Sequence, residues 1–253
     1  MVSDVLISAF DLIHHRLYSP VIIIGMHRSG TSMLAEVLHQ SGIHMGEDRD
    51  HNFEALHFLS INQRAMWKAG ADWFKPIQPP DECFDHPGIH ELFKIHFKIH
   101  GNRKYLLHKL LNKPWGWKDP RNTFTLPYWL QLFPEAKVIH LIRHGWDVAL
   151  SLQNRNKIPG EAHHPDLDDP MSGFALWNKY VSQAMAYAHT DILHIRYEDL
   201  ILHQKEPIEQ LESFLNTKIK AHLTATAKQT RRTELRYPDI ICQNEWINKF
   251  YSC

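Results

Sequence analysis

Short apolar segments alternate with longer amphipathic ones along most of the chain. Three runs rich in β-branched residues, at 20–25, 136–143 and 191–196, are typical of buried parallel strands, and a shorter strand is predicted at "WGWKDP" (115–120). Helices are predicted where apolar residues recur every three or four positions, over 30–42, 52–70, 89–111, 125–133, 146–155, 173–188 and 206–216. This alternation predicts a single α/β domain over residues 1–253, a three-layer sandwich with a central parallel sheet flanked by helices.

Charge and composition narrow the class of protein. Lys and Arg together number 28, as do Asp and Glu, so no overall field favours nucleic acid or an anionic membrane, and any anion site must be local. No apolar run approaches the ~18 residues of a membrane span, and the N-terminus lacks the apolar core of a signal peptide. The three cysteines, Cys83, Cys242 and Cys253, are far apart and odd in number, which predicts no disulfide framework and a cytoplasmic location.

The first predicted strand runs into a loop that is similar to a nucleotide-phosphate loop with an altered basic residue. In "GMHRSGTS" (25–32), glycines would let backbone N–H groups at the start of the next helix hold an anion, and Ser29, Thr31 and Ser32 add hydroxyl donors. An ATP- or GTP-binding loop would carry lysine where this chain has Thr31, and here the basic residue is Arg28. A P-loop kinase or NTPase therefore stays only as an alternative, and a nucleotide-binding module without activity is another.

A second basic site is predicted where the strand at 136–143 ends. Arg143 closes this strand, Ser151 lies eight residues on in the following helix, and Arg155 lies one helical turn further along. Ligands of parallel sheets sit at the carboxyl ends of the strands, where these residues would join the glycine loop. Their convergence predicts a site for one more phosphate group. The alternative is that Arg143 pairs with Asp147 and that Ser151 has no role in binding.

Four segments, in the same order, resemble sulfotransferases that use 3′-phosphoadenosine 5′-phosphosulfate (PAPS) as donor. "GMHRSGTSML" is similar to their 5′-phosphosulfate loop and "RHGWDVALS" to their 3′-phosphate motif. "GWKDPRNTFTLPYW" resembles the "KDP" segment of tyrosylprotein sulfotransferases and many bacterial members, and "IRYEDL" resembles the adenine-side turn. The resemblance covers roughly residues 20 to 215. It implies a P-loop nucleotide-kinase-like fold, PAPS as co-substrate, no metal requirement, and a hydroxyl or amine acceptor.

The resemblance also implies roles for individual residues. Arg28 would contact the leaving 5′-phosphate and the transferred group, and Lys118 would face the oxygen that bridges phosphorus and sulfur. Tyr197 would lie beside the adenine. The remaining donor-binding residues would be Ser29, Gly30, Thr31 and Ser32 around the 5′-phosphate, and Arg143, Ser151 and Arg155 around the 3′-phosphate.

The general base is predicted from a further part of the resemblance. Cytosolic small-molecule members carry a histidine in a "KTHLP"-type segment, whereas this chain has "KDPRN" and no histidine there. Bacterial and tyrosylprotein members share a glutamate on the helix after the loop region, and "HNFEALHFL" matches that context with Glu54. Such a base needs burial to raise its pKa. The alternatives are a first-turn glutamate that stabilises the helix dipole, or His57 or His51 as the base.

The acceptor has no signature in this sequence. Irregular segments at 71–88 and 156–170 are expected to shape its pocket, and the basic segment at 227–238 is expected in place of the family's cofactor-closing loop. The sequence contains neither an HExxH motif nor a Cys/His quartet, so no metal site is predicted. Four tryptophans are candidates for lining the acceptor pocket: Trp67, Trp73, Trp115 and Trp117.

Overall fold

The computed structural model describes residues 19–46, 48–84, 113–161, 163–187, 191–203, 205–220 and 237–251. These segments contain all four predicted strands and all but one of the predicted helices. The helix predicted at 89–111 lies outside them, as does the basic segment at 227–238 except for its last two residues.

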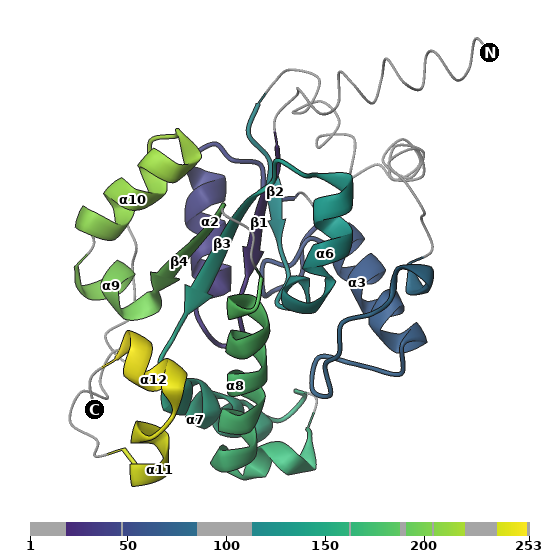
Figure 1. Cartoon of the computed structure of the whole chain (residues 1–253), viewed down its shortest axis with the longest axis vertical. Coiled ribbons are helices and arrows are strands. Elements are labelled where there is room, and N and C mark those ends of the chain that lie inside the picture. The colour runs from purple at the N-terminus through teal and green to yellow at the C-terminus, as the bar shows by residue number, and fades with distance from the viewer. Residues whose placement is uncertain are drawn as a thin grey trace.

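Four parallel strands form the central sheet, in the order β2-β1-β3-β4 (Figure 1). Their bounds are Val21–Ile24 for β1, Gly116–Lys118 for β2, Lys137–Ile142 for β3 and Ile192–Arg196 for β4. Each strand lies within a predicted one, and β1, which precedes the glycine loop, pairs with both β2 and β3. All four carboxyl ends therefore open on the same edge of the sheet, where ligands bind in folds of this class.

Helices follow the strands, as the apolar spacing predicts. Some bounds differ from prediction: α3 begins at Leu56 rather than at 52, α6 at Asn122 rather than at 125, and α8 at Pro170 rather than at 173. A short helix, α9, forms in the segment that resembles the adenine-side turn, and α11 and α12 had no predicted counterpart. The α-helices are α2 Thr31–Gln40, α3 Leu56–Lys68, α6 Asn122–Leu132, α7 Gly145–Asn156, α8 Pro170–Met185, α9 Tyr197–Leu202, α10 Lys205–Leu215, α11 Asp239–Cys242 and α12 Glu245–Phe250. Two 3₁₀ turns, η1 Asp81–Cys83 and η3 Pro165–Asp168, lie in the predicted irregular segments.

The side chains of β1 alternate between the two faces of the sheet and so contact both helix layers. Ile22 and Ile24 pack with Phe58 of α3 and with aromatic residues of β2 and α6. Val21 and Ile23 pack on the other face, with leucines of α2, α9 and α10. Figure 1 shows α2 and α10 on one side of the sheet and α3 and α6 on the other. The predicted three-layer α/β sandwich is therefore confirmed.

Two further findings bear on the environment of the chain. Within the described ranges, no helix is both long enough and apolar enough to cross a membrane.

Cys83 is a free thiol, but Cys242 is disulfide-bonded, so the prediction of no disulfide is wrong for this residue. Spacing along a chain does not show which cysteines the fold brings together. The cytoplasmic location, which rested partly on that prediction, stays a prediction.

A buried amide on α3 ties this helix to the segment after β2. The Asn62 side chain is fully buried and donates to Asp119 at 2.9 Å and to Asn122 at 2.8 Å. Its oxygen accepts from the Thr125 hydroxyl at 2.8 Å and from the Trp129 indole N–H at 2.9 Å. Four hydrogen bonds from one side chain hold the start of α6 against α3, and with it the end of β2.

We predict that Asn62→Ala lowers the free energy of unfolding by about 2–4 kcal/mol, because it leaves buried partners without a hydrogen bond at about 1–3 kcal/mol each. The matched control is Ser60→Ala on the same helix, whose half-buried hydroxyl bonds only to the His57 carbonyl and should cost no more than about 0.5 kcal/mol. Urea unfolding measures both variants. Equal losses would show that the Asn62 amide does not hold α3 and α6 together.

Candidate functional site

The loop after β1 presents backbone N–H groups at the start of α2. Arg28 and Gly30 have left-handed backbone angles, with φ of 69° and 88°, which turn the chain sharply from strand into helix. Gly30 precedes α2 and supplies no side-chain cap, so the first turn of the helix can hold an anion through its N–H groups. A Cβ on Gly25 would lie 2.5 Å from the Leu141 carbonyl oxygen, and one on Gly30 would lie 2.4 Å from the Tyr197 ring. Close packing therefore requires glycine at both positions.

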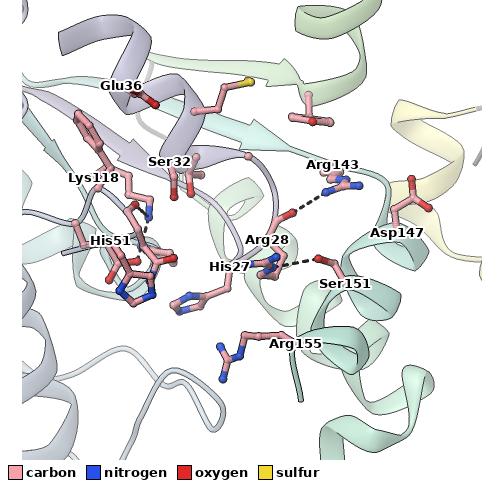
Figure 2. Close-up of a pocket in the computed structure, with 18 of the residues that line it drawn as sticks. His27, Arg28, Ser32, Glu36, His51, Lys118, Arg143, Asp147, Ser151 and Arg155 are labelled. Atoms are coloured by element: carbon pink, nitrogen blue, oxygen red, sulfur yellow. Dashed lines mark hydrogen bonds and ion pairs between the residues drawn. The ribbon is translucent and has the colours of Figure 1, made fainter. Parts of the chain in front are cut away.

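This loop borders a cleft of about 710 Å³ at the carboxyl edge of the sheet (Figure 2). The cleft is lined from all four strands, with Lys118 at the end of β2, Arg143 just after β3 and Tyr197 just after β4. Ser29 does not line it, because its side chain is buried. All the other predicted site residues do: Arg28, Gly30, Thr31, Ser32, Glu54, Lys118, Arg143, Ser151, Arg155 and Tyr197.

Three arginines, here called the arginine cluster, gather on one side of the cleft: Arg28, Arg143 and Arg155 (Figure 2). Arg28 Nε donates to Ser151 Oγ at 3.1 Å, and Arg143 donates to the Arg28 backbone carbonyl at 3.1 Å. The Arg143 guanidinium also lies over the Tyr197 ring, 4.9 Å from its centroid. Burial and the charges of Arg155 and Arg143 lower the pKa of Arg28. An anion relieves such repulsion, so this side of the cleft suits a phosphate group.

A second group of charges, here called the buried ion cluster, consists of Glu54, Lys118, Asp119 and Arg121. Glu54 Oε1 accepts from Lys118 Nζ at 3.0 Å, and Oε2 accepts from Arg121 Nη1 at 3.2 Å. Lys118 Nζ also donates to the Asn52 carbonyl at 2.9 Å, and Arg121 Nη1 donates to Asp119 at 2.8 Å. Glu54 is only 3% exposed and precedes α3. The alternative of a first-turn glutamate that stabilises the helix dipole therefore does not hold.

The environment of Glu54 shifts its pKa in the direction that a general base needs. Burial raises this pKa most strongly, Lys118 and Arg121 lower it, and Asp119 raises it, with a net rise above the usual value. A raised pKa brings a carboxylate closer to the neutral range in which a base works best. Of the two histidines considered as alternatives, His51 lines the cleft, whereas His57 is buried on α3 and does not border it.

Sequence reasoning missed two residues of the site, Arg121 and His27. Arg121 stands in the quoted "KDPRN" segment, but its contact with Glu54 spans 67 positions of the chain and left no spacing signal. His27 stands inside the glycine loop and lines the cleft, with its ring 5.0 Å from that of Trp73. Burial, followed by the charges of Arg121 and Lys118, lowers the pKa of His27 well below its usual value, so the ring stays neutral.

The two segments expected to shape the acceptor pocket meet next to the cleft. Phe74 and His164 lie with ring centroids 3.5 Å apart, and Arg155 lies over the Trp73 ring at 5.1 Å. The other three candidate tryptophans do not contribute: Trp115 and Trp117 belong to the core and Trp67 is exposed on α3. In the parts of the chain that the structure describes, no group of three or more His, Cys, Asp or Glu side chains is placed to hold a metal ion.

The known proteins that are similar to this chain are sulfotransferases. A family model described as "Sulfotransferase family" matches residues 20–221. A relative from Caenorhabditis briggsae, described as a "Putative protein-tyrosine sulfotransferase", is 25% identical over 202 residues, which cover 78% of this chain and 65% of that protein. This chain therefore spans slightly less than two thirds of that relative's length.

Two solved structures show how far the likeness in three dimensions extends. The sulfotransferase domain of the Synechococcus PCC 7002 olefin synthase matches with a TM-score of 0.51 at 17% identity, over 85% of this chain and 80% of that one. Mouse sulfotransferase SULT7A1 complexed with PAP matches with a TM-score of 0.47 at 16% identity, over 92% and 78%. At 17% identity, the likeness to the olefin synthase domain concerns the fold alone.

We predict that Gly30→Ala destabilises the fold more than Gly42→Ala does. Both glycines have left-handed φ, 88° and 97°, but a Cβ on Gly30 would meet the Tyr197 ring, whereas one on Gly42 has no described neighbour within 4 Å. Backbone strain of about 1–2 kcal/mol is common to both, and overpacking adds about 1–3 kcal/mol for Gly30. Urea unfolding separates the two effects. Equal losses would mean that Tyr197 does not confine the loop.

Proposed function

Because the chain belongs to the sulfotransferase family of enzymes, we propose that it transfers a sulfuryl group from PAPS to a hydroxyl or amine acceptor by in-line displacement. The observation that carries this proposal is the arrangement of one cleft, which has an anion-binding helix start, the arginine cluster and a buried Glu54–Lys118 pair along its walls. PAPS offers a 3′-phosphate and a 5′-phosphosulfate, which are two anionic groups for the arginine cluster and the helix start.

The donor would bind through the loop and the arginine cluster. The N–H groups of α2, with Thr31 and Ser32, would hold the 5′-phosphate. Ser151, Arg143 and Arg155 would hold the 3′-phosphate. Since Arg28 contacts Ser151, we expect the 3′-phosphate to take over that hydroxyl and to turn Arg28 toward the phosphosulfate.

The reaction would use both members of the Glu54–Lys118 pair. The acceptor oxygen or nitrogen attacks sulfur and passes its proton to Glu54, while the bond between sulfur and the bridging oxygen breaks and adenosine 3′,5′-bisphosphate leaves. Lys118 would neutralise the charge that develops on the bridging oxygen. Its contact with Glu54 Oε1 at 3.0 Å would loosen as it turns to the donor, which frees that oxygen for the proton.

The sulfuryl group carries one negative charge fewer than a terminal phosphoryl group, so side-chain cations would suffice without a metal ion. The loop supports the same conclusion, because Thr31 occupies the position where a P-loop kinase needs lysine. A kinase would favour ATP with magnesium, and a nucleotide-binding module without activity would bind but not transfer. The two experiments below separate these alternatives.

We expect adenosine 3′,5′-bisphosphate to stabilise the protein more than ADP does, because only the former carries a 3′-phosphate for the arginine cluster. A ligand at ~100 times its dissociation constant adds about 2.7 kcal/mol to the free energy of unfolding. Thermal unfolding with each nucleotide measures the difference. Ser151→Ala should weaken the response to the bisphosphate more than the response to ADP. Equal responses of the unaltered protein to both nucleotides would count against a 3′-phosphate site.

We expect Glu54→Gln to lower kcat by about 10²–10⁴-fold through loss of the base, and Lys118→Ala by about 10²–10³-fold through loss of charge stabilisation. The assay follows transfer from radiolabelled PAPS to a panel of phenols, alcohols and amines. Retained stabilisation by adenosine 3′,5′-bisphosphate is the control for folding and donor binding. Full transfer by both variants would show that these residues do not have the proposed roles.

A further inference from the structure

The buried ion cluster contains two carboxylates and two cations, and only half of it borders the cleft. Glu54 and Lys118 line the cleft, whereas Asp119 and Arg121 lie behind them. We propose that Asp119 and Arg121 are a positioning pair, which holds one oxygen of Glu54 in place and sets the pH range in which this carboxylate accepts a proton. The proposal rests on the proposed function, in which Glu54 is the base.

The two carboxylate oxygens of Glu54 contact different cations. Arg121 Nη1 lies 3.2 Å from Oε2 and 2.8 Å from Asp119 Oδ1, so one nitrogen bridges both carboxylates. Lys118 Nζ lies 3.0 Å from Oε1. When Lys118 turns to a bound donor, Oε1 becomes the open oxygen, while Arg121 keeps Oε2 and the plane of the carboxylate fixed from behind.

Asp119 is held too firmly to follow movements in the cleft. Its side chain is fully buried. Its Oδ1 accepts from the Arg121 backbone N–H at 3.0 Å as well as from the guanidinium, and its Oδ2 accepts from the Asn62 amide at 2.9 Å. Through Asn62, the pair is connected to α3 and α6 rather than to the donor-binding loop. Glu54 is thus oriented by the rigid layer of the fold.

The charges around Glu54 show what the pair does to its proton affinity. Lys118 and Arg121 lower the pKa of Glu54 and Asp119 raises it, so Asp119 offsets the effect of Arg121. Burial alone would lower the pKa of Arg121, but Asp119 and Glu54 outweigh it and raise that pKa, so Arg121 stays charged at every working pH. Without Asp119, Glu54 would face two uncompensated cations and would be too weak a base.

Two other titratable groups near Glu54, Tyr180 and His27, do not change charge between pH 5 and 9 and so do not imitate this effect. Asp50 is held within its own turn, where it accepts the backbone N–H groups of Asn52 and Glu54 and the Asn52 amide. Burial raises the pKa of Tyr180 on α8 far above neutrality, and burial lowers that of His27 well below it. Both therefore stay neutral. His51 also lines the cleft. The reference protein and all variants in the titration therefore carry His51→Gln, so that the charge of His51 does not affect the result.

Replacing the two members of the pair should shift the pKa of Glu54 in opposite directions. A purely structural role would not produce this result. Asp119→Asn removes a negative charge and should lower the pKa of Glu54. Arg121→Gln removes a positive charge and should raise it. A single charge at this distance shifts a pKa by about one to three units. The double variant should titrate between the two single variants.

The test is a direct titration of Glu54 by ¹³C NMR in protein labelled at the glutamate carboxyl carbon. Glu54→Gln identifies the signal by its absence. The matched control is Glu212→Gln on α10, which breaks an ion pair with Lys218 and should leave the Glu54 titration unchanged. Opposite shifts in Asp119→Asn and Arg121→Gln support the pair. Unmoved titrations, or shifts in the same direction, overturn it.

The proposal can still be tested if one of the single variants does not fold. If Arg121→Gln does not fold because it leaves Asp119 buried without its cation, the double variant removes both charges, and its Glu54 must titrate above that of Asp119→Asn. The result is also separable from the proposed function. Full sulfuryl transfer by Glu54→Gln would refute the role of Glu54 as general base. Loss of transfer in that variant, together with an unchanged Glu54 titration in Asp119→Asn and Arg121→Gln, would refute only the positioning pair.

Discussion

Burying an ionised carboxylate is costly unless cations and hydrogen bonds surround it, and the burial of Glu54 imposes this constraint on the fold around the cleft. Its two oxygens require Lys118 from the end of β2 and Arg121 from the start of α6. The chain before α3 must therefore turn back toward the sheet, which it does through Phe53 at a positive φ of 62° and through Asp50, which accepts two backbone N–H groups. Segments that are distant in sequence meet because one charge has to be compensated.

The cleft consequently has two charged regions of different character. In the buried ion cluster, two carboxylates balance two cations within the protein, so this region is formed before any ligand arrives. In the arginine cluster, burial and then the charges of Arg155 and Arg143 lower the pKa of Arg28, so like charges repel one another there. In the proposed reaction the first region would be preorganised for proton transfer, and a bound anion would stabilise the second.

The sequence alone predicted those features that depend on local spacing. β-Branched runs ending at glycine or arginine located β1 and β3, and the interval from Arg143 to Ser151 placed both in the cleft, because a strand end and the next helix are adjacent in any parallel α/β fold. Features that depend on contacts between distant segments were missed. Arg121 contacts Glu54 across 67 positions of the chain, beside the point where Asn62 joins α3 to α6, and the disulfide at Cys242 has no spacing signature. Ser29 was predicted from its motif, but the turn of the loop buries it.

The position of Arg28 explains how a loop without the P-loop lysine can serve a donor with two anionic ends. Its guanidinium lies on Ser151, on the arginine side of the cleft and away from Lys118 (Figure 2). In the proposed reaction the loop cation is therefore not at the transferred group until something displaces it from Ser151. A 3′-phosphate would do so by taking that hydroxyl and leaving Arg28 free for the 5′ side, whereas a nucleotide without a 3′-phosphate would leave the contact in place. In this proposal, recognition of one end of the donor would be coupled to stabilisation of charge at the other, with the same arginine serving both.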